Sequence, residues 1–289
     1  MIKKKIYSIN SGFYDVYDGN KLIRLRGAGK LRNKNIKPLV GDYVTISNGF
    51  IEDVLPRKNE LLRPKVANID NAFIVYSLKQ PEFSSFMVDK YLAMVEYNEI
   101  NPILVFTKAD LSSDNYWFEQ YQKLGYTCLI IGHYNKVEDQ EIVNKNIDKI
   151  NSFLDKKTSV FMGQSGVGKS TLINTITGMN LKIDQISKAL NRGKHTTRIV
   201  EIYRYNNSEI IDTPGFSNLI VPLNSQELSR SFQIFKNNKV FCKFRSCLHV
   251  NIDKKYCKIL QLLQEGKIPQ FRYDNYLKIL KESNALKIY

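Results

Sequence analysis

Long apolar runs are missing from this chain of 289 residues. No stretch approaches the roughly 18–20 apolar residues that a helix needs to cross a bilayer, so no membrane-spanning helix is predicted. The start, MIKKKIYSIN, carries charge but no apolar segment, and we do not expect it to act as a signal peptide. We therefore expect a cytoplasmic protein that has no membrane partner and acts as a monomer.

Cysteine is also scarce, with four residues in the whole chain. Three of the four lie near the C-terminal end, close to a histidine. In a cytosolic chain this clustering favours a metal site over disulfide bonds. Internal repeats and low-complexity segments are absent as well.

Acidic side chains are too few to balance the basic ones, since 28 Asp and Glu face 43 Lys and Arg, for a net charge of +15. The excess lies at the two ends: residues 1–66 carry +8, residues 67–230 carry −1 and residues 231–289 carry +8. A near-neutral middle between two basic flanks predicts a core with two arms for a polyanion.

Residues 1–66 alternate short strand patterns, such as KLIRL and DYVTI, with turn signals such as Ser47-Asn48-Gly49. Several short strands in so small a region predict a barrel of the OB type, which often binds oligonucleotides through its loops. The loop GKLRNKNIK supplies four basic residues that we predict to contact RNA: Lys30, Arg32, Lys34 and Lys37.

Residues 67–222 alternate apolar strand patterns with helical ones. The runs AFIVYSL, PILVF, TCLII and SVFM predict buried strands, and residues 115–124 and 138–154 predict helices between them. This alternation is typical of a parallel sheet with crossover helices, and therefore of an α/β domain.

The segment GQSGVGKS, at residues 163–170, matches the phosphate-binding P-loop and lies between a strand and a helix. Its backbone N–H groups and the helix N-terminus are expected to hold the phosphates. Lys169 is expected to reach the β- and γ-phosphates and to serve catalysis, and Ser170 to bind Mg²⁺. The predicted nucleotide-binding residues of this segment are Gly163, Gln164, Ser165, Gly166, Val167, Gly168, Lys169, Ser170 and Thr171.

Two further motifs favour a guanine nucleotide. In EIIDTPG, Asp212 ends an apolar strand where a carboxylate can face Mg²⁺, and Gly215 can donate its N–H to the γ-phosphate. In TKAD (Thr107, Lys108, Ala109 and Asp110), Asp110 can accept from both donors of guanine, whereas adenine offers no such pair. The usual motif begins with Asn; a hydroxyl at Thr107 makes fewer hydrogen bonds, so we expect lower affinity.

The order of these motifs is reversed, because TKAD precedes the P-loop. We interpret the reversal as a circular permutation, which domains tolerate because their termini often lie close together. One consequence is that the DTPG segment leads almost directly into residues 223–289, the predicted C-terminal domain.

That C-terminal domain contains Cys242, Cys247, His249 and Cys257, in a C-x4-C-x-H-x7-C array. Three thiolates and one imidazole make a closed tetrahedral set for one structural Zn²⁺. We predict an α-helical zinc-binding domain. Cys128 lies in a predicted buried strand and is expected to be inert.

A basic OB-like start, a permuted GTPase and a three-cysteine, one-histidine zinc site together resemble the RsgA (YjeQ) family of bacterial GTPases. The resemblance covers nearly the whole chain. It implies action on the 30S ribosomal subunit late in its assembly, binding to 16S rRNA, and hydrolysis of GTP to GDP that the subunit stimulates. The spacing from His249 to Cys257 is two residues longer than the family's common pattern, which enlarges the last zinc loop.

The segment RGKHTTR, at residues 192–198, resembles the family's switch I, in which a Thr reaches Mg²⁺ and the γ-phosphate. This implies roles for Thr196 and Thr197. Ras-like GTPases carry a water-orienting Gln directly after DxxG, but here Phe216 stands there. His195 is then the best internal candidate for the catalytic group, because an imidazole can orient or deprotonate water.

Two other functions remain open at this point. One is a zinc- and OB-containing RNA-binding protein whose GTPase core acts only as a nucleotide-sensing switch. The other is an ATP-dependent kinase built on the same P-loop, against which Asp110 and the DTPG segment argue.

Overall fold

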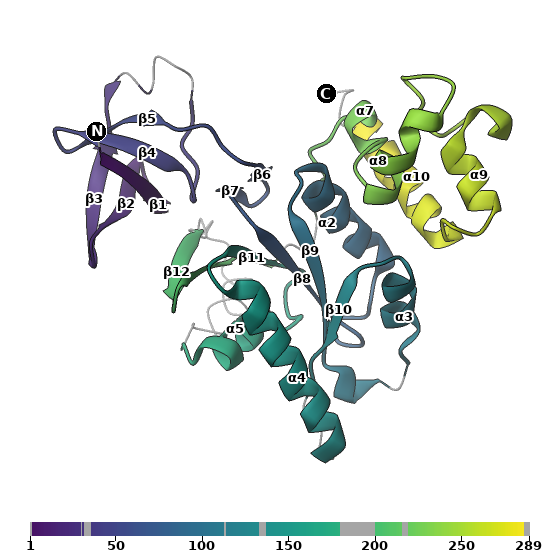
Figure 1. Cartoon of the computed structure of the whole chain (residues 1–289), viewed down its shortest axis with the longest axis horizontal. Coiled ribbons are helices and arrows are strands. Elements are labelled where there is room, and N and C mark those ends of the chain that lie inside the picture. The colour runs from purple at the N-terminus through teal and green to yellow at the C-terminus, as the bar shows by residue number, and fades with distance from the viewer. Residues whose placement is uncertain are drawn as a thin grey trace.

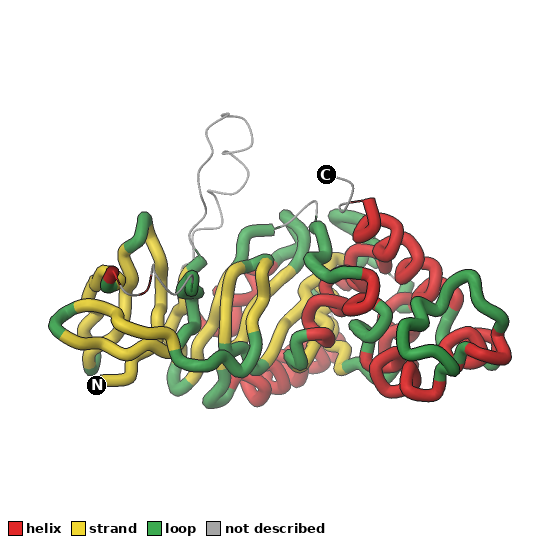
Figure 2. Tube along the Cα trace, turned by 90° about the horizontal axis from the view of Figure 1, so that it is seen from above, coloured by secondary structure: helices red, strands yellow, loops and turns green. Residues whose placement is uncertain are grey.

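The computed structural model describes residues 2–29, 31, 36–112, 114–132, 137–179, 200–215 and 219–285. These residues form a β-barrel, a central α/β domain and a helical C-terminal domain, arranged in a row (Figure 1). Figure 2 shows the strands running from the barrel into the central sheet, with helices gathered at the opposite end. Within these ranges, no helix combines the length and the apolar character needed to cross a membrane.

Several predicted functional residues lie outside the described residues. They are Lys30, Arg32 and Lys34 of the barrel loop, Phe216, and the segment 192–198 with His195, Thr196 and Thr197. Their predicted roles therefore stay predictions.

The N-terminal strands are β1 (Ile2–Asn10), β2 (Phe13–Asp18), β3 (Lys21–Gly27), β4 (Tyr43–Ser47) and β5 (Phe50–Val54). They pair in the order β1-β2-β3-β5-β4, and β4 pairs back onto β1, which closes the barrel. The turn between β4 and β5 is Asn48-Gly49, both at positive φ, as a tight two-residue hairpin requires. The predicted OB-like barrel is therefore confirmed.

A short hairpin of β6 (Glu60–Leu62) and β7 (Lys65–Ala67) separates the barrel from the central domain. The central strands are β8 (Asn71–Ser77), β9 (Asn101–Thr107), β10 (Thr127–Ile130), β11 (Thr158–Met162), β12 (Glu201–Tyr205) and β13 (Ser208–Asp212). Five of them run parallel in the order β10-β9-β8-β11-β13, and β12 pairs antiparallel with β13 on one side and with β1 of the barrel on the other. The parallel α/β prediction is confirmed; β12 was not predicted.

The central helices are α2 (Ser85–Tyr97), the short η1 (Ala109–Leu111), α3 (Tyr116–Lys123), α4 (Val137–Leu154) and α5 (Lys169–Thr177). Side chains alternate along β8, so that Phe73 and Val75 pack with α4 and α5, whereas Ile74 and Tyr76 pack with α2. Both faces of the sheet are thus covered, which explains why β8 is apolar throughout.

The C-terminal elements are α7 (Ser225–Leu228), α8 (Gln233–Asn238), η3 (Lys239–Phe241), η4 (Lys254–Tyr256), α9 (Lys258–Gln264) and α10 (Gln270–Ala285). Their apolar residues join the α2 side of the central core. A buried polar network reinforces this contact: Arg272 of α10 pairs with Asp89 of α2, and Asn275 donates to the same carboxylate at 2.8 Å. The C-terminal domain is therefore docked firmly on α2.

The barrel is joined to the sheet by a second network. The Lys5 ammonium of β1 pairs with Glu209 of β13 and donates to the Thr158 hydroxyl of β11 at 2.7 Å. The Tyr7 hydroxyl donates to the same Glu209 carboxylate. Lys5 is nearly buried, so the barrel and the central sheet share an interior contact.

Candidate functional site

The P-loop takes its shape from glycines. Gly163 follows β11 with φ +152°, and a Cβ there would lie 2.2 Å from the carbonyl oxygen of Val75. Gly168, at φ +94°, places Lys169 at the first turn of α5. The Lys169 ammonium donates to the carbonyls of Gly163 at 3.1 Å and Gln164 at 2.9 Å. The loop therefore curls around its own lysine at the end of a helix, as a phosphate site requires.

Asp212 lies beside this loop at the end of β13. The Ser170 hydroxyl donates to its Oδ2 at 3.2 Å, whereas the buried Oδ1 makes no hydrogen bond to any described residue. Burial raises the pKa of Asp212, although Lys169 and Ser170 oppose the shift. An orphaned carboxylate oxygen next to a serine hydroxyl fits a hard cation such as Mg²⁺, which prefers oxygen ligands.

Gly215 packs directly against the P-loop. A Cβ at this position would lie 2.5 Å from both the N and Cα atoms of Ser165, so no larger residue fits. The DTPG segment thus touches the loop that precedes α5.

The TKAD loop is hydrogen-bonded to the P-loop at two points. The Thr107 hydroxyl lies 2.6 Å from the Val167 carbonyl oxygen and 3.1 Å from that of Tyr76. The Lys108 ammonium donates to Gly166 O at 2.9 Å and also contacts Gln80 O. Thr107 therefore fixes the two loops relative to each other despite replacing the usual Asn.

A pocket of about 380 Å³ opens between these loops. Five of the predicted residues line it: Thr107, Lys108, Asp110, Gly168 and Thr171. Other lining residues were not predicted from the sequence, among them Gln80, Ile131, Gly132, Leu172 and Thr175. Ile131 and Gly132 could have been found, because they follow β10, whose carboxyl end meets the same edge of the sheet.

The neighbouring strands also explain the reversed motif order. TKAD follows β9 and the P-loop follows β11, and both loops lie at one edge because these strands run parallel on either side of β8. The site is thus assembled from two stretches of chain whose order can be exchanged without changing the geometry.

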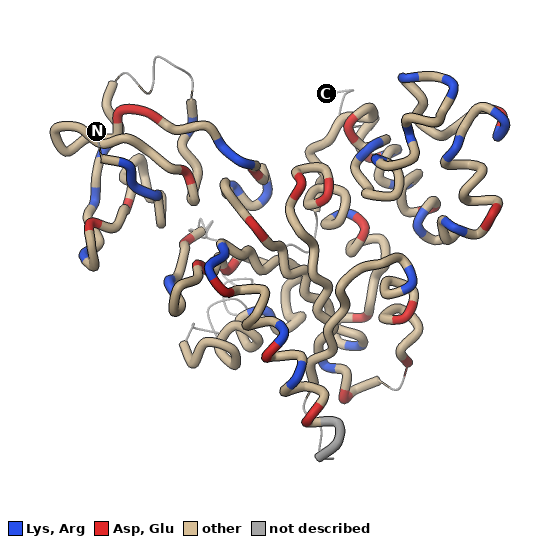
Figure 3. The backbone as a smooth tube through the Cα atoms, in the orientation of Figure 1, with Lys and Arg blue, Asp and Glu red and all other residues tan. Residues whose placement is uncertain are grey.

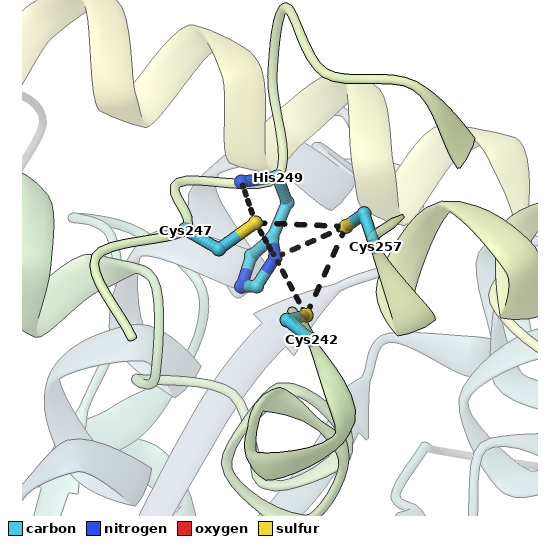
Figure 4. A group of neighbouring side chains, drawn as sticks. All are labelled: Cys242, Cys247, His249 and Cys257. Carbon is cyan, nitrogen blue, oxygen red and sulfur yellow. Dashed lines mark hydrogen bonds between the residues drawn. The ribbon is translucent and has the colours of Figure 1, made fainter. Parts of the chain in front are cut away.

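The four predicted metal ligands converge in the C-terminal domain (Figure 4). The sulfur of Cys257 lies 4.0 Å from that of Cys242 and 3.8 Å from that of Cys247, and the three sulfurs lie 3.4–3.8 Å from His249 Nδ1. A zinc tetrahedron with usual bond lengths has S···S edges of about 3.8 Å and S···N edges of about 3.6 Å. The spacing fits a tetrahedral metal and is far too long for a disulfide.

The imidazole of His249 is oriented by a backbone contact. Its Nε2 lies 2.9 Å from the Ser229 carbonyl oxygen, so Nε2–H donates there and Nδ1 turns its lone pair to the sulfurs. Burial lowers the pKa of His249 to about 4, which keeps the ring neutral. Cys128 lies apart from this cluster, and burial raises the pKa of its thiol to about 12, as suits an inert side chain.

Basic residues occur in both end domains, where they outnumber the acidic ones, and in the central domain (Figure 3). In the barrel, the predicted contact Lys37 is exposed and lines a pocket with Arg26. Beside the metal cluster, Phe241 is 68% exposed, and the ammonium groups of Lys243 and Lys255 lie 4.3 and 4.8 Å from the Tyr256 ring centre. Phe244, which is 46% exposed, lies 5.6 Å from the same Lys243 ammonium, and such rings beside cations suit nucleic-acid bases.

Comparison with known proteins covers nearly the whole chain. Residues 4–50 match the RsgA N-terminal domain and residues 54–222 match the RsgA GTPase family. A protein of Mycoplasmopsis agalactiae named small ribosomal subunit biogenesis GTPase RsgA is 50% identical over 284 residues, which cover 97% of this chain and 98% of the relative. A Bacillus subtilis protein of the same name is 39% identical over 300 residues, covering 98% and 97%.

Two solved structures share the whole architecture. The crystal structure of YloQ, described as a circularly permuted GTPase, aligns with a TM-score of 0.71 at 34% identity and covers 98% of this chain and 95% of its own. The crystal structure of YjeQ from Thermotoga maritima aligns with a TM-score of 0.74 at 29% identity, covering 97% and 98%. The chain therefore belongs to the RsgA family of circularly permuted small ribosomal subunit biogenesis GTPases.

Proposed function

We propose that the chain binds GTP with Mg²⁺ in the pocket between the TKAD loop and the P-loop and hydrolyses it while bound to the 30S ribosomal subunit. The main support for this nucleotide site is a pair of hydrogen bonds between the two loops, one from Thr107 and one from Lys108, to carbonyl oxygens of the P-loop. It brings Asp110, the guanine-reading residue, to the same pocket as the start of α5.

The metal would be held by Ser170 and Asp212, whose orphaned Oδ1 supports this assignment. When bound, Mg²⁺ would neutralise part of the negative charge of the phosphates. Lys169 binds the β- and γ-phosphates in the same site. Lys169→Ala should therefore abolish hydrolysis while leaving the fold intact.

Thr196 and Thr197 are proposed to complete the site from switch I, and His195 to orient the attacking water in place of the residue missing at Phe216. The test is single-turnover hydrolysis with and without 30S subunits for the wild type and His195→Ala. Full 30S stimulation in the variant would mean that the catalytic group lies on the ribosome or elsewhere in this chain.

We propose one structural Zn²⁺ at Cys242, Cys247, His249 and Cys257, which fixes the C-terminal domain rather than taking part in hydrolysis. The tetrahedral spacing of the ligand atoms and the orienting bond from Ser229 support this. The C-terminal surface formed by Phe241, Lys243, Lys255 and Tyr256 would then contact 16S rRNA, as would the basic barrel loop.

RNA affinity should fall linearly with log salt, with a slope set by the number of phosphates contacted. Replacing Lys30, Arg32, Lys34 and Lys37 together by Gln should flatten that slope. A variant that keeps both the wild-type affinity and the wild-type slope would show that this loop does not contact RNA.

The decisive experiment for the partner is sedimentation with purified 30S and 50S subunits in GDP and in a non-hydrolysable GTP analogue. We expect co-sedimentation with 30S only, and more of it with the analogue. Equal binding to both subunits would contradict the proposal, and 30S binding that ignores the nucleotide would favour a plain RNA-binding protein. A competition assay between GTP and ATP for the nucleotide site tests the kinase alternative, which requires a preference for ATP.

A further inference from the structure

The metal cluster of Cys242, Cys247, His249 and Cys257 has a charge that its own ligands do not balance (Figure 4). Three thiolates and a neutral imidazole around a divalent ion leave one net negative charge. Cys247, His249 and Cys257 are each at most 5% exposed, so this charge lies largely out of water. A buried charge is costly unless an opposite charge accompanies it. We therefore expect the folded domain to supply a cation beside the sulfurs.

Lys239, three residues before Cys242, is a cation in a suitable place. Its side chain is half-buried, and its ammonium donates to the Ser229 hydroxyl. Burial and the neighbouring Arg230 lower the pKa of Lys239, whereas Cys247 and Cys242 act to raise it. The ammonium is thus within electrostatic reach of both sulfurs.

Ser229 holds this cation and the histidine ligand at the same time. The residue is fully buried, and its hydroxyl accepts from Lys239 and donates to Gln226 O at 2.7 Å. Its carbonyl oxygen accepts from His249 Nε2 at 2.9 Å. Ser229 also ends α7, and its amide donates to Ser225 O at 3.0 Å. The end of one helix therefore fixes both the imidazole ligand and the Lys239 ammonium.

Other lysines near the cluster have different surroundings. Lys243 and Lys255 are exposed, and their ammonium groups lie over the Tyr256 ring. Water and salt screen charges in such positions, whereas a partly buried charge is screened much less. The charge of Lys239 should therefore act on the metal site more strongly than the charges of these exposed lysines.

We infer that Lys239 is the counter-charge of the metal site and raises its affinity for Zn²⁺ without being a ligand. The inference rests on the zinc site proposed above. The site carries its buried negative charge only when the metal is bound, so a nearby ammonium favours the loaded state. Removing an outer partner of this kind typically weakens metal binding by about 10- to 100-fold.

The test is the zinc affinity of the full chain, measured by competition with a chromophoric chelator at fixed pH. Lys239→Met keeps the length of the side chain without its charge and should bind zinc about 10- to 100-fold more weakly than the wild type. Lys239→Arg keeps the charge and should recover most of the affinity. Equal losses in the two variants would show that the shape of the side chain matters rather than its charge, and would overturn the inference.

Lys236→Met is the matched control. Lys236 lies three residues before Lys239 and has the same charge, but it is exposed and pairs with Glu99 of α2 at 2.6 Å. This variant should keep the wild-type zinc affinity, because exposed ion pairs contribute little.

Co²⁺ in place of zinc gives a second readout, since it reports tetrahedral thiolate ligation by its absorption bands. These bands should be the same in the wild type and in Lys239→Met, because Lys239 is not a ligand. Altered bands would show that Lys239 shapes the ligand set, which contradicts a role as counter-charge.

If Lys239→Met does not fold, Ser229→Ala tests the same point. It removes the hydroxyl that holds the ammonium and leaves the carbonyl oxygen that holds His249. It should weaken zinc binding at least about threefold, the scale of one hydrogen bond. Unchanged affinity in this variant would overturn the inference.

The outcomes separate the two proposals. A wild type that holds no zinc overturns the zinc site itself. A wild type that holds zinc, with a Lys239→Met variant that binds it as tightly as Lys236→Met does, overturns the role of Lys239 alone. If that variant keeps its zinc affinity but loses binding to 30S subunits, Lys239 contacts the partner instead.

Discussion

Thr107→Val tests how the nucleotide pocket is assembled. The substitution replaces the hydroxyl by a methyl group of nearly the same size in a position that is 5% exposed. A hydroxyl has one proton to donate, and its shorter contact, at 2.6 Å, is to the Val167 carbonyl in the P-loop. The variant therefore removes the Thr107 hydrogen bond between the TKAD loop and the P-loop, leaves the one from Lys108 in place and creates no cavity.

The expected magnitude follows from that one bond. A buried carbonyl left without a donor costs about 1–3 kcal/mol. If the P-loop must keep its shape to bind phosphates, this cost appears in the affinity, which should fall by about 5- to 150-fold. Titration with a fluorescent GDP derivative at fixed Mg²⁺ measures the change.

Thr175→Val provides the control. Thr175 lines the same pocket, but its hydroxyl donates to Thr171 O within α5 at 3.0 Å and does not contact the P-loop carbonyls. Its variant should bind GDP within about twofold of the wild type, as surface substitutions usually do. An equal loss in both variants, or none in Thr107→Val, would refute the assembly of the pocket through Thr107.

Three further predictions follow from the buried contacts. Arg272→Met leaves the Asp89 carboxylate buried without its cation and should destabilise the chain by about 3–5 kcal/mol in urea denaturation; a loss below 1 kcal/mol would contradict it. Cys257→Ser should lower the zinc content from one equivalent to below half by elemental analysis, and a full equivalent would exclude Cys257 as a ligand. Although burial raises it, the pKa of Glu209 is held below its ordinary value of 4.5 by Lys5, so this junction should stabilise fully above that pH and weaken as the pH falls further. Glu209→Gln should reduce the fall in melting temperature at acid pH. An unchanged fall would mean that other groups cause the acid destabilisation.

Much of the site was predictable because its chemistry is local in sequence. The phosphate loop carries its glycines, lysine and serine within eight residues, and a strand and a helix flank it as expected. The four metal ligands lie within sixteen residues, so that their spacing alone indicated one tetrahedral site. The predicted helices 115–124 and 138–154 agree with α3 and α4 to within one residue at each end.

Contacts between distant residues left no such pattern. Lys5 and Glu209 are separated by 204 positions and Asp89 and Arg272 by 183, and each looks like an ordinary surface charge in the sequence. The strand β12 was missed because it is half-exposed and lacks the continuous apolar run of its neighbours, although Asn206, at positive φ, lies in its hairpin turn. Lys239 likewise gives no sign in sequence that its ammonium is held by Ser229.

The most direct test of the whole account is single-turnover GTP hydrolysis by the chain alone, with 30S subunits and with 50S subunits. We predict slow turnover by the chain alone, roughly 10⁻³–10⁻⁴ per second, as in GTPases without an activating partner. We further predict that 30S subunits raise the rate at least about tenfold, which corresponds to lowering the activation free energy by about 1.4 kcal/mol. We predict no stimulation by 50S subunits. Fast turnover without the ribosome, or equal stimulation by the two subunits, would contradict it.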